Sequence, residues 1–276
     1  MPKPPRKTTL KPVQHDTWPD RPPTAARPVR CRARTLPMDT HILQHQHAWA
    51  QFTYCASGLM QVTVVQGEVQ TTYIVPPSRA LWIPPGVQHT VVVLESAELR
   101  TVSIAPHVLP PDWTECRVLV VSSLLREVVH ALDGSEPSAR EQTLTALALD
   151  EMRRADTQQL GVPMPHPLHG DKRLRALCEA VLRNPAERGP LRDWAHQMGA
   201  SERTMARLFR DELGTSYQQW RLQAILATAM PQLARGRPIA QVAAAAGYAS
   251  DIAFSAMFKQ AMGQAPSHFQ ARTLSK

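Results

Sequence analysis

The C-terminal third of the chain carries one pattern of apolar residues twice. The first copy occupies residues 191–214 and the second occupies residues 239–263, with matching positions 48 or 49 residues apart. Each copy holds two apolar stripes at helical spacing, divided by a glycine, Gly199 or Gly247, where a first helix must end. A serine follows two or three residues later, and its hydroxyl can cap a second helix. The pattern therefore predicts two helix-turn-helix units.

Two other architectures also repeat helices: a solenoid and a small helical bundle. A solenoid needs roughly three or more copies to bury a continuous core, and this chain has two. A bundle does not require cations outside the apolar stripe, yet Arg203 and Arg207 share an outer face, away from Met205 and Phe209. An exposed arginine pair is usually just a solvated surface. Within a duplicated helix-turn-helix it favours DNA reading, because arginine can donate two hydrogen bonds to guanine.

The second helix of each unit is expected to face DNA. The DNA-facing residues predicted there are Ser201, Glu202, Arg203, Thr204, Ala206, Arg207, Arg210, Ser250, Asp251, Ile252, Ser255 and Lys259. The segment between the units, residues 217–235, would span about 28 Å as a helix, against roughly 34 Å between successive major grooves. With the width of the flanking helices added, one chain could reach adjacent grooves. Pro231 lies inside this segment and should bend the helix or cost about 3 kcal/mol.

Residues 35–110 change from helical spacing to a strand pattern. Short runs rich in β-branched residues, at 61–66, 68–75, 80–83 and 89–94, are separated by glycine or proline turns. Several short strands at this spacing indicate a small β-barrel or jelly roll.

Residues 111–160 are expected to add two amphipathic helices, at 118–132 and 138–155. These helices could cover the open face of the barrel, and the sequence alone does not decide their role. Residues 161–170 are rich in proline and predict a semi-rigid linker. Residues 1–34 are rich in Pro, Lys and Arg with almost no apolar periodicity, which predicts a disordered basic tail.

The predicted fold class is α+β with two domains. The first is a small N-terminal β-barrel with helices, and the second is an all-α double helix-turn-helix domain at residues 171–276. A length of 276 residues allows each domain its own core. The net charge of +8 is divided into +7 for residues 1–34, −6 for residues 35–170 and +7 for residues 171–276. An acidic middle between basic ends is expected if the ends meet phosphate and the middle does not.

The cysteines and the apolar runs indicate a compartment. Cys31, Cys55, Cys116 and Cys178 are scattered, with no C-x-x-C pair. This fits a reducing cytoplasm and argues against a structural zinc held by thiolates. No apolar run approaches the roughly 20 residues of a membrane span, and the N-terminus lacks the apolar region of a signal peptide. We therefore expect a cytoplasmic protein without a membrane partner.

A group of histidines lies in the strand region. His45 and His47 are two residues apart, so on a strand both would point into the barrel, where His89 could join them. Three imidazoles suit Zn, Ni, Cu or Fe(II), so these histidines are candidate ligands of a divalent transition metal. With Trp49 and Gln51 they could instead bind a small organic effector, because an amide orients a polar group and an indole supplies flat apolar surface. A third interpretation is a satisfied interior without a ligand.

The C-terminal hundred residues resemble the AraC-type transcriptional regulators. The matching residues are Ala195, Gly199, Ser201, Leu208, Phe209, Gly214, Gly247, Tyr248, Ser250, Ala253, Phe254, Phe258, Lys259, Gly263 and Pro266. The resemblance implies a homodimer that binds double-stranded promoter DNA and, if it is an activator, contacts RNA polymerase. In relatives, helices like those predicted at 118–132 and 138–155 pair the two subunits. Many relatives place Gln or Arg where the second reading helix of this chain has Asp251, Ile252 and Ser255. The first reading helix is therefore expected to carry most of the specificity.

The histidine region resembles the cupin double motif, H-x-H-x3-E-x6-G followed by P-x-G-x2-H-x3-N. Gln51 stands in place of the Glu, which removes the one anionic ligand, and Val93 stands in place of the Asn. The form H-x-H-x-W-x-Q is similar to AraC-type regulators that sense small toxic compounds and control a neighbouring efflux transporter gene. The implied function is effector-controlled transcription regulation rather than catalysis. The alternative is a cupin-type metal-dependent enzyme with an accessory helical domain, and the missing Glu and Asn argue against it.

Overall fold

The computed structural model describes residues 11–13, 22–77, 79–187 and 189–274. Within them a sheet of ten strands is followed by helices, which confirms the predicted α+β class. The strands are β1 (Lys11–Val13), β2 (Val29–Leu36), β3 (Thr40–His45), β4 (Ala50–Gln66), β5 (Val69–Val75), β6 (Arg79–Ile83), β7 (Gln88–Ile104), β8 (Arg117–Val120), β9 (Thr157–Gln158) and β10 (Gly161–Pro165). The helices are η2 (Pro106–Val108), α1 (Ser123–Leu132), α2 (Ala139–Arg154), α3 (Lys172–Arg183), α4 (Leu191–Gln197), α5 (Glu202–Leu213), α6 (Tyr217–Ala234), α7 (Ile239–Ala245), α8 (Asp251–Met262) and α9 (Pro266–Leu274).

Two long strands, β4 and β7, organise the sheet. They are antiparallel along nearly their whole length, and each also pairs with two shorter strands, β4 with β5 and β6, β7 with β2 and β3. The ladder is interrupted between Cys55 and Met60, where Gly58 has a φ of 79°. A Cβ at Gly58 would lie 2.2 Å from the carbonyl oxygen of Ser96, so only glycine allows the two backbones to approach this closely. The predicted barrel or jelly roll is thus a rolled sheet that is not closed.

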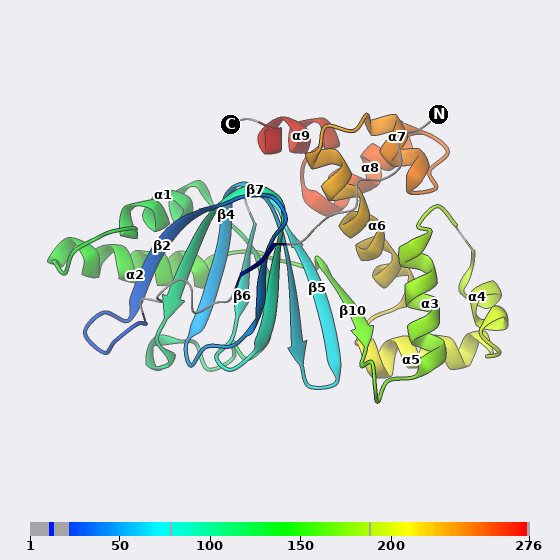
Figure 1. Ribbon diagram of the computed structural model, residues 1–276, viewed down its shortest axis with the longest axis horizontal. Coiled ribbons are helices and arrows are strands. Elements are labelled where there is room, and N and C mark those ends of the chain that lie inside the picture. Colours follow the sequence, from blue (N-terminus) through cyan, green and yellow to red (C-terminus); the bar gives the residue numbers. More distant parts are fainter. Residues whose placement is uncertain (1–10, 14–21, 78, 188, 275–276) are drawn as a thin grey trace.

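The helices α1 and α2 cover one face of this sheet (Figure 1). Leu125, Val129 and Met152 are buried in one apolar cluster with Phe52 and Trp82 of the sheet. The helices therefore cover the sheet, and their pairing of two subunits stays a prediction. The first helix was expected to begin at residue 118, but the run from 118 to 120 belongs to β8, because its β-branched residues pair with β6. Helix α1 begins only after the cap Ser122, whose side chain accepts from the Leu125 amide.

The prediction of a disordered tail over residues 1–34 is wrong for the described part of that range. Residues 29–36 form β2 and pair with β7, with Val29 and Cys31 buried. Arg27 forms an ion pair with Glu141 of α2. Residues 1–10 and 14–21 lie outside the described residues. The expected linker also differs, because residues 161–165 form β10, which pairs with β5.

The C-terminal helices contain the two predicted helix-turn-helix units, α4–α5 and α7–α8. Ser201 accepts from the backbone amide of Thr204, and Ser250 accepts from that of Ala253, so both expected caps are present. Helix α6 joins the units and continues through Pro231, which lies near its C-terminal end. The missing hydrogen bond, from the nitrogen of Pro231 to the carbonyl of Ala227, therefore falls within the last two turns of the helix.

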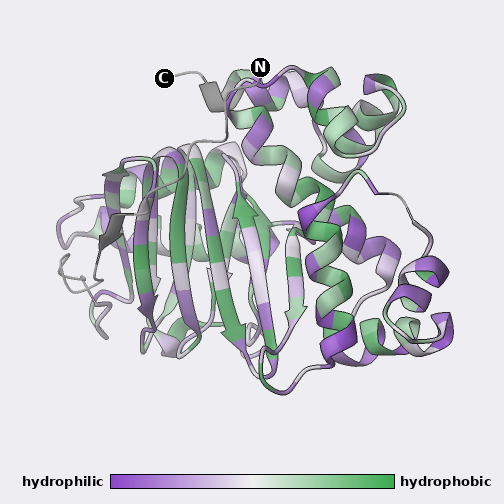
Figure 2. Cartoon of the chain, turned by 45° about the vertical axis from the view of Figure 1, so that its right-hand side comes forward, coloured by the Kyte–Doolittle hydropathy of each residue, from purple (hydrophilic) through white to green (hydrophobic). Residues whose placement is uncertain are grey.

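The apolar core of the described residues divides unequally between the two units. The first unit packs with α3 and β10 around Leu177, Phe209 and Trp220. The second unit belongs to a larger cluster, in which Met230 and Phe258 are joined with the interior of the sheet. Figure 2 shows hydrophobic residues along the strands and on the helices beside them. The second unit therefore shares its core with the interior of the N-terminal sheet, whereas the first has a separate core to which the sheet contributes only β10.

Among the described residues, no helix is both long enough and apolar enough to cross a membrane.

Candidate DNA-reading helices and effector site

Helix α5 presents its cations on the side away from its packed face. Met205 and Phe209 are buried, whereas Arg203 and Arg207 are exposed. The Nε of Arg207 lies 4.0 Å from the Asp211 carboxylate, and each side chain is about two-thirds exposed. Exposed pairs of this kind contribute little to stability. The Arg207 guanidinium can therefore turn toward DNA at small cost.

Helix α8 offers a different surface. Phe254 and Phe258 are fully buried, and Asp251 and Lys259 are exposed. Ile252 is 78% exposed in the first turn of the helix, where no core packing accounts for an isoleucine. Its methyl groups can contact the C5-methyl group of thymine in the major groove.

The residues predicted to face DNA are all accessible. The exposed ones are Ser201, Glu202, Arg203, Arg207, Arg210, Ser250, Asp251, Ile252 and Lys259, and the half-buried ones are Thr204, Ala206 and Ser255. Their contact with DNA stays a prediction.

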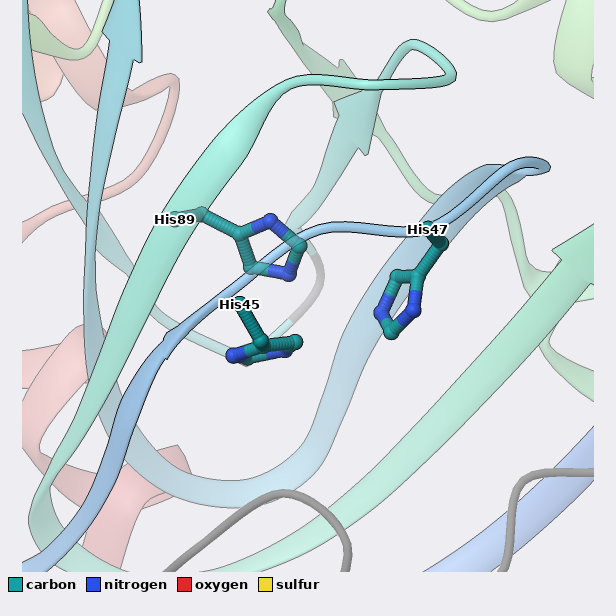
Figure 3. A group of neighbouring side chains, drawn as sticks. All are labelled: His45, His47 and His89. Atoms are coloured by element: carbon teal, nitrogen blue, oxygen red, sulfur yellow. The ribbon is translucent and has the colours of Figure 1, made fainter.

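The three predicted histidines come together (Figure 3). The ring centroids of His45 and His89 are 4.1 Å apart, and those of His47 lie 5.0 and 5.3 Å from them. One ligand atom from each residue lies within 4.8 Å of the others. His45 and His89 face each other across β3 and β7. His47 was expected on the same strand as His45, but it lies in the loop after β3, and the loop turns its ring back toward the other two.

Backbone carbonyls orient two of these rings. The Nδ1 of His45 lies 2.7 Å from the Leu43 carbonyl, and the Nδ1 of His89 lies 2.9 Å from the Val87 carbonyl. A carbonyl can only accept, so both Nδ1 atoms carry the hydrogen and the lone pair is on Nε2. Histidines that bind metals are usually held in this way. The same arrangement allows Nε2 to accept a hydrogen bond from an organic molecule.

Trp49 completes one side of the group. Its ring is stacked on His47, with centroids 4.9 Å apart and planes 12° apart. The indole N–H is buried and has no hydrogen-bond partner among the described residues. Gln51 is also buried, but its amide donates to the Thr53 hydroxyl at 2.6 Å. The structure thus gives Gln51 a partner on its own strand.

A cavity of about 520 Å³, which no sequence pattern predicts, lies between the sheet and the first helix-turn-helix unit. Tyr73 and Cys116 line it from the sheet side, and Trp220 and Gln223 line it from α6. Burial raises the pKa of the Cys116 thiol to about 12 and also raises the pKa of Tyr73, so both groups are neutral there. These residues are scattered along the chain, and only the folded arrangement brings them together.

Two sets of polar contacts also join the sheet to the second unit. Arg79 of β6 is 7% exposed and donates to the carbonyl of Met262, the last residue of α8, at 2.8 Å. Gln158 of β9 bonds to Arg79 and donates to the preceding carbonyl of the same helix. Beyond α6, Arg235 is 2.6 Å from the carboxylate of Glu95. The C-terminal end of the second reading helix is therefore capped by the sheet.

Comparison with known proteins gives matches in both parts of the chain. Residues 28–150 match the AraC-like ligand binding domain, and residues 194–272 match a helix-turn-helix domain. The HTH-type transcriptional regulator NimR of Escherichia coli is 35% identical over 233 residues, which are 83% of this chain and 82% of that protein. The arabinose operon regulatory protein of E. coli is 29% identical over 54% of this chain and 51% of its own. A structure of ToxT from Vibrio cholerae aligns with 90% of this chain and all of its own, at 11% identity and a TM-score of 0.39.

The match to NimR covers most of both chains. It favours a regulator over the cupin enzyme that the histidines alone would allow, because the curated relatives found are transcription regulators. A ligand-binding N-terminal region followed by two helix-turn-helix units is also what the structure contains. The chain belongs to the AraC-type helix-turn-helix transcriptional regulators.

Proposed function

We propose that this regulator is controlled by a small organic effector bound at His45, His47, His89 and Trp49. The observation that carries the proposal is the stacked pair of Trp49 and His47, with a buried indole N–H that has no partner in the described structure. A flat molecule with a hydrogen-bond acceptor would extend the stack and satisfy this donor. Such an effector would be drawn from the cytoplasm, and a neighbouring efflux transporter gene is the target that we propose.

Two reading helices would divide the recognition of promoter DNA. Arg203 and Arg207 of α5 are exposed and suit guanine O6 and N7. Ile252 of α8 suits a thymine methyl group, and Lys259 suits phosphate. A homodimer would place two pairs of reading helices on a DNA site that repeats its sequence. Contact with RNA polymerase would follow if the protein activates transcription.

The effector would act through the contacts between the sheet and the second unit. Arg79 and Arg235 hold α8 and the end of α6 against the sheet. An effector that binds this docked arrangement more tightly than an undocked one shifts the population by its difference in affinity and no more. DNA affinity would change because the two reading helices must fit successive grooves together.

A metal-dependent sensor is the second candidate, and the orientation of the histidines favours it. The Nδ1 atoms of His45 and His89 donate to carbonyls, which leaves Nε2 as the ligand atom. Three neutral imidazoles fit a zinc, nickel or copper ion. The carboxylate that would neutralise its charge is replaced by Gln51, whose amide is bonded to Thr53.

Selection of DNA provides the first test. The full-length protein without an affinity tag should enrich a defined sequence from a random duplex library, and no enrichment would contradict the DNA-reading role. Flat heteroaromatic compounds can then be screened for a rise in melting temperature and a change in affinity for the selected DNA. Both responses should disappear in Trp49→Ala and persist in His107→Ala, an exposed histidine elsewhere. Equal responses in both variants would place the effector at another site.

Elemental analysis separates the two kinds of sensor. Near-stoichiometric metal that is lost in His47→Ala, together with control of DNA binding, would favour the metal-dependent sensor. Metal far below stoichiometry, with DNA control intact after chelation, would support the organic effector.

A further inference from the structure

A second group of metal-ligating side chains, separate from the histidines of the effector site, lies where β10 ends. Glu68, His166 and His169 each offer a ligand atom, and these atoms lie within 4.8 Å of one another. Glu68 is in the turn between β4 and β5, and the two histidines follow β10. They are therefore contributed by two segments about a hundred residues apart in sequence.

The sheet places Glu68 beside His166. In the antiparallel pair of β5 and β10, Pro165 is opposite Val69. One step further along this register, His166 is opposite Glu68. The Nδ1 of His166 lies 3.9 Å from the nearer carboxylate oxygen of Glu68. The imidazole is 21% exposed, so the fold, rather than chance on a solvated surface, holds it there.

A tight turn returns His169 to the same place. The Gly170 amide donates to the His166 carbonyl at 3.0 Å. A Cβ at Gly170 would lie 2.7 Å from the Cβ of Pro165, so a larger residue would open the turn. The rings of His166 and His169 are stacked, with centroids 4.8 Å apart and planes 10° apart. Arg175 of α3 holds the start of the turn by donating to the Pro165 carbonyl at 2.8 Å.

We propose that Glu68, His166 and His169 bind a divalent transition metal, with zinc as the best fit. Two imidazoles and one carboxylate form a three-ligand set that leaves a fourth position for water. Here the carboxylate supplies the negative charge that the His45 group lacks. The Nδ1 of His166 accepts from the amides of Leu168 and His169 at 3.2 and 3.3 Å. Zinc would replace these two bonds. It would also turn the His166 ring out of its stack with His169, because the lone pairs of two parallel rings cannot meet at one ion.

The bound ion would fasten the β4–β5 turn to the connection between β10 and α3. That connection leads from the sheet into the first helix-turn-helix unit. Zinc would therefore set the freedom of the first reading helix relative to the sheet, independently of any effector.

Zinc titration of the full-length, untagged protein tests the site. After removal of metal with EDTA, the wild type should bind one equivalent more zinc than the His166→Gln/His169→Gln variant. A matched control, His107→Gln/His130→Gln, changes two exposed histidines away from the turn and should bind as the wild type does. Because the His45 group is intact in all three proteins, its zinc cancels in the comparison. Equal zinc binding by the wild type and the first variant would overturn the proposal.

Proteolysis gives a second measurement at the turn itself. Leu168 lies between the two histidines and is 79% exposed, which makes it a site for chymotrypsin. Zinc should slow cleavage after Leu168 in the wild type and leave the rate unchanged in the double variant. If that variant fails to fold, Glu68→Gln keeps the shape of a side chain that is 73% exposed. This substitution should raise the zinc concentration needed to protect Leu168 from cleavage by roughly tenfold or more. Protection at the same zinc concentration as in the wild type would contradict the assignment.

Discussion

At the level of single side chains, the two reading helices offer different chemistry to DNA. Helix α5 presents the guanidinium groups of Arg203 and Arg207, which can donate hydrogen bonds to purine edges. Helix α8 presents Asp251, which can only accept, and Ile252, which can do neither. The second helix is therefore expected to read methyl groups and cytosine amino groups rather than guanine.

Arg207→Ala should weaken binding to the selected DNA by about 1–3 kcal/mol and leave binding to random DNA nearly unchanged, because only base contacts discriminate between sequences. Fluorescence anisotropy on both duplexes measures the two affinities. Arg192→Ala is the matched control, since Arg192 is exposed on α4 outside the reading helices. An equal loss on both duplexes would mean that Arg207 contacts only phosphate.

The role of Ile252 can be tested by removing the C5-methyl group of single thymines in the DNA. Replacing thymine by uracil, one position at a time, should reduce wild-type affinity at one position by about 0.8 kcal/mol, or roughly fourfold. Ile252→Ala should be insensitive to that replacement, whereas Leu168→Ala, another exposed apolar residue, should keep the wild-type penalty. If the ratio of wild-type to Ile252→Ala affinity is the same for every uracil duplex as for the thymine duplex, Ile252 does not read the methyl group.

At the level of secondary structure, each reading helix is delimited by a serine cap and a glycine end. Gly214 and Gly263 end α5 and α8 in the left-handed conformation. These signals are local, and the buried residues between them follow a helical stripe. The sequence alone therefore sufficed to predict both units, with their caps.

Loss of a cap should cost about 0.5–2 kcal/mol, and replacement by glycine only a few tenths. Ser250→Ala is thus expected to lower the urea midpoint of the second unit, and Ser250→Gly should lower it much less. Urea titration followed by circular dichroism at helical wavelengths makes the comparison. Equal losses in the two variants would point to a role for the hydroxyl other than capping.

The strands were harder to predict for a physical reason. Residues 50–55 of β4 are buried on both faces, so the alternation that marks a half-buried strand is absent there. In β2, apolar residues alternate with Arg30, Arg32 and Arg34, but the high local charge favoured disorder. The pairing with β7 decides the structure of β2, and that pairing is not visible in a local window.

The same limit applies to the sites. The spacing of His45 and His47 was sufficient to group them, and His89 followed from the resemblance to cupins. By contrast, Arg79 meets α8 across 183 residues of sequence, and no periodicity links the two. Contacts of this range can be known only from the folded chain.

At the level of the whole molecule, the hydrogen bond from the buried Arg79 joins the sheet to the end of α8. Its loss should therefore change the behaviour of a helix in another part of the fold. Arg79→Met would leave the Met262 carbonyl without its donor, at a cost of about 1–3 kcal/mol. Hydrogen exchange measured by mass spectrometry should become faster in the last turn of α8. Arg126→Met, at an exposed position on α1, is the control and should exchange as the wild type does. Unchanged protection of α8 in Arg79→Met would mean that the sheet does not hold the reading helix.

The division of the apolar core also determines which segments of this regulator can be exchanged with those of a relative. Because the second unit shares its interior with the sheet, a hybrid joined at residue 166 would set foreign side chains against Met230 and Phe258. The first unit instead packs with β10, α3 and the start of α6, up to Ala224. In packing terms it is an insertion into a body formed by the sensor and the second unit. Exchanging residues 162–224 for the corresponding segment of a relative would carry most of β10 along with the first unit, and would give the rest of the sensor a new DNA sequence to recognise.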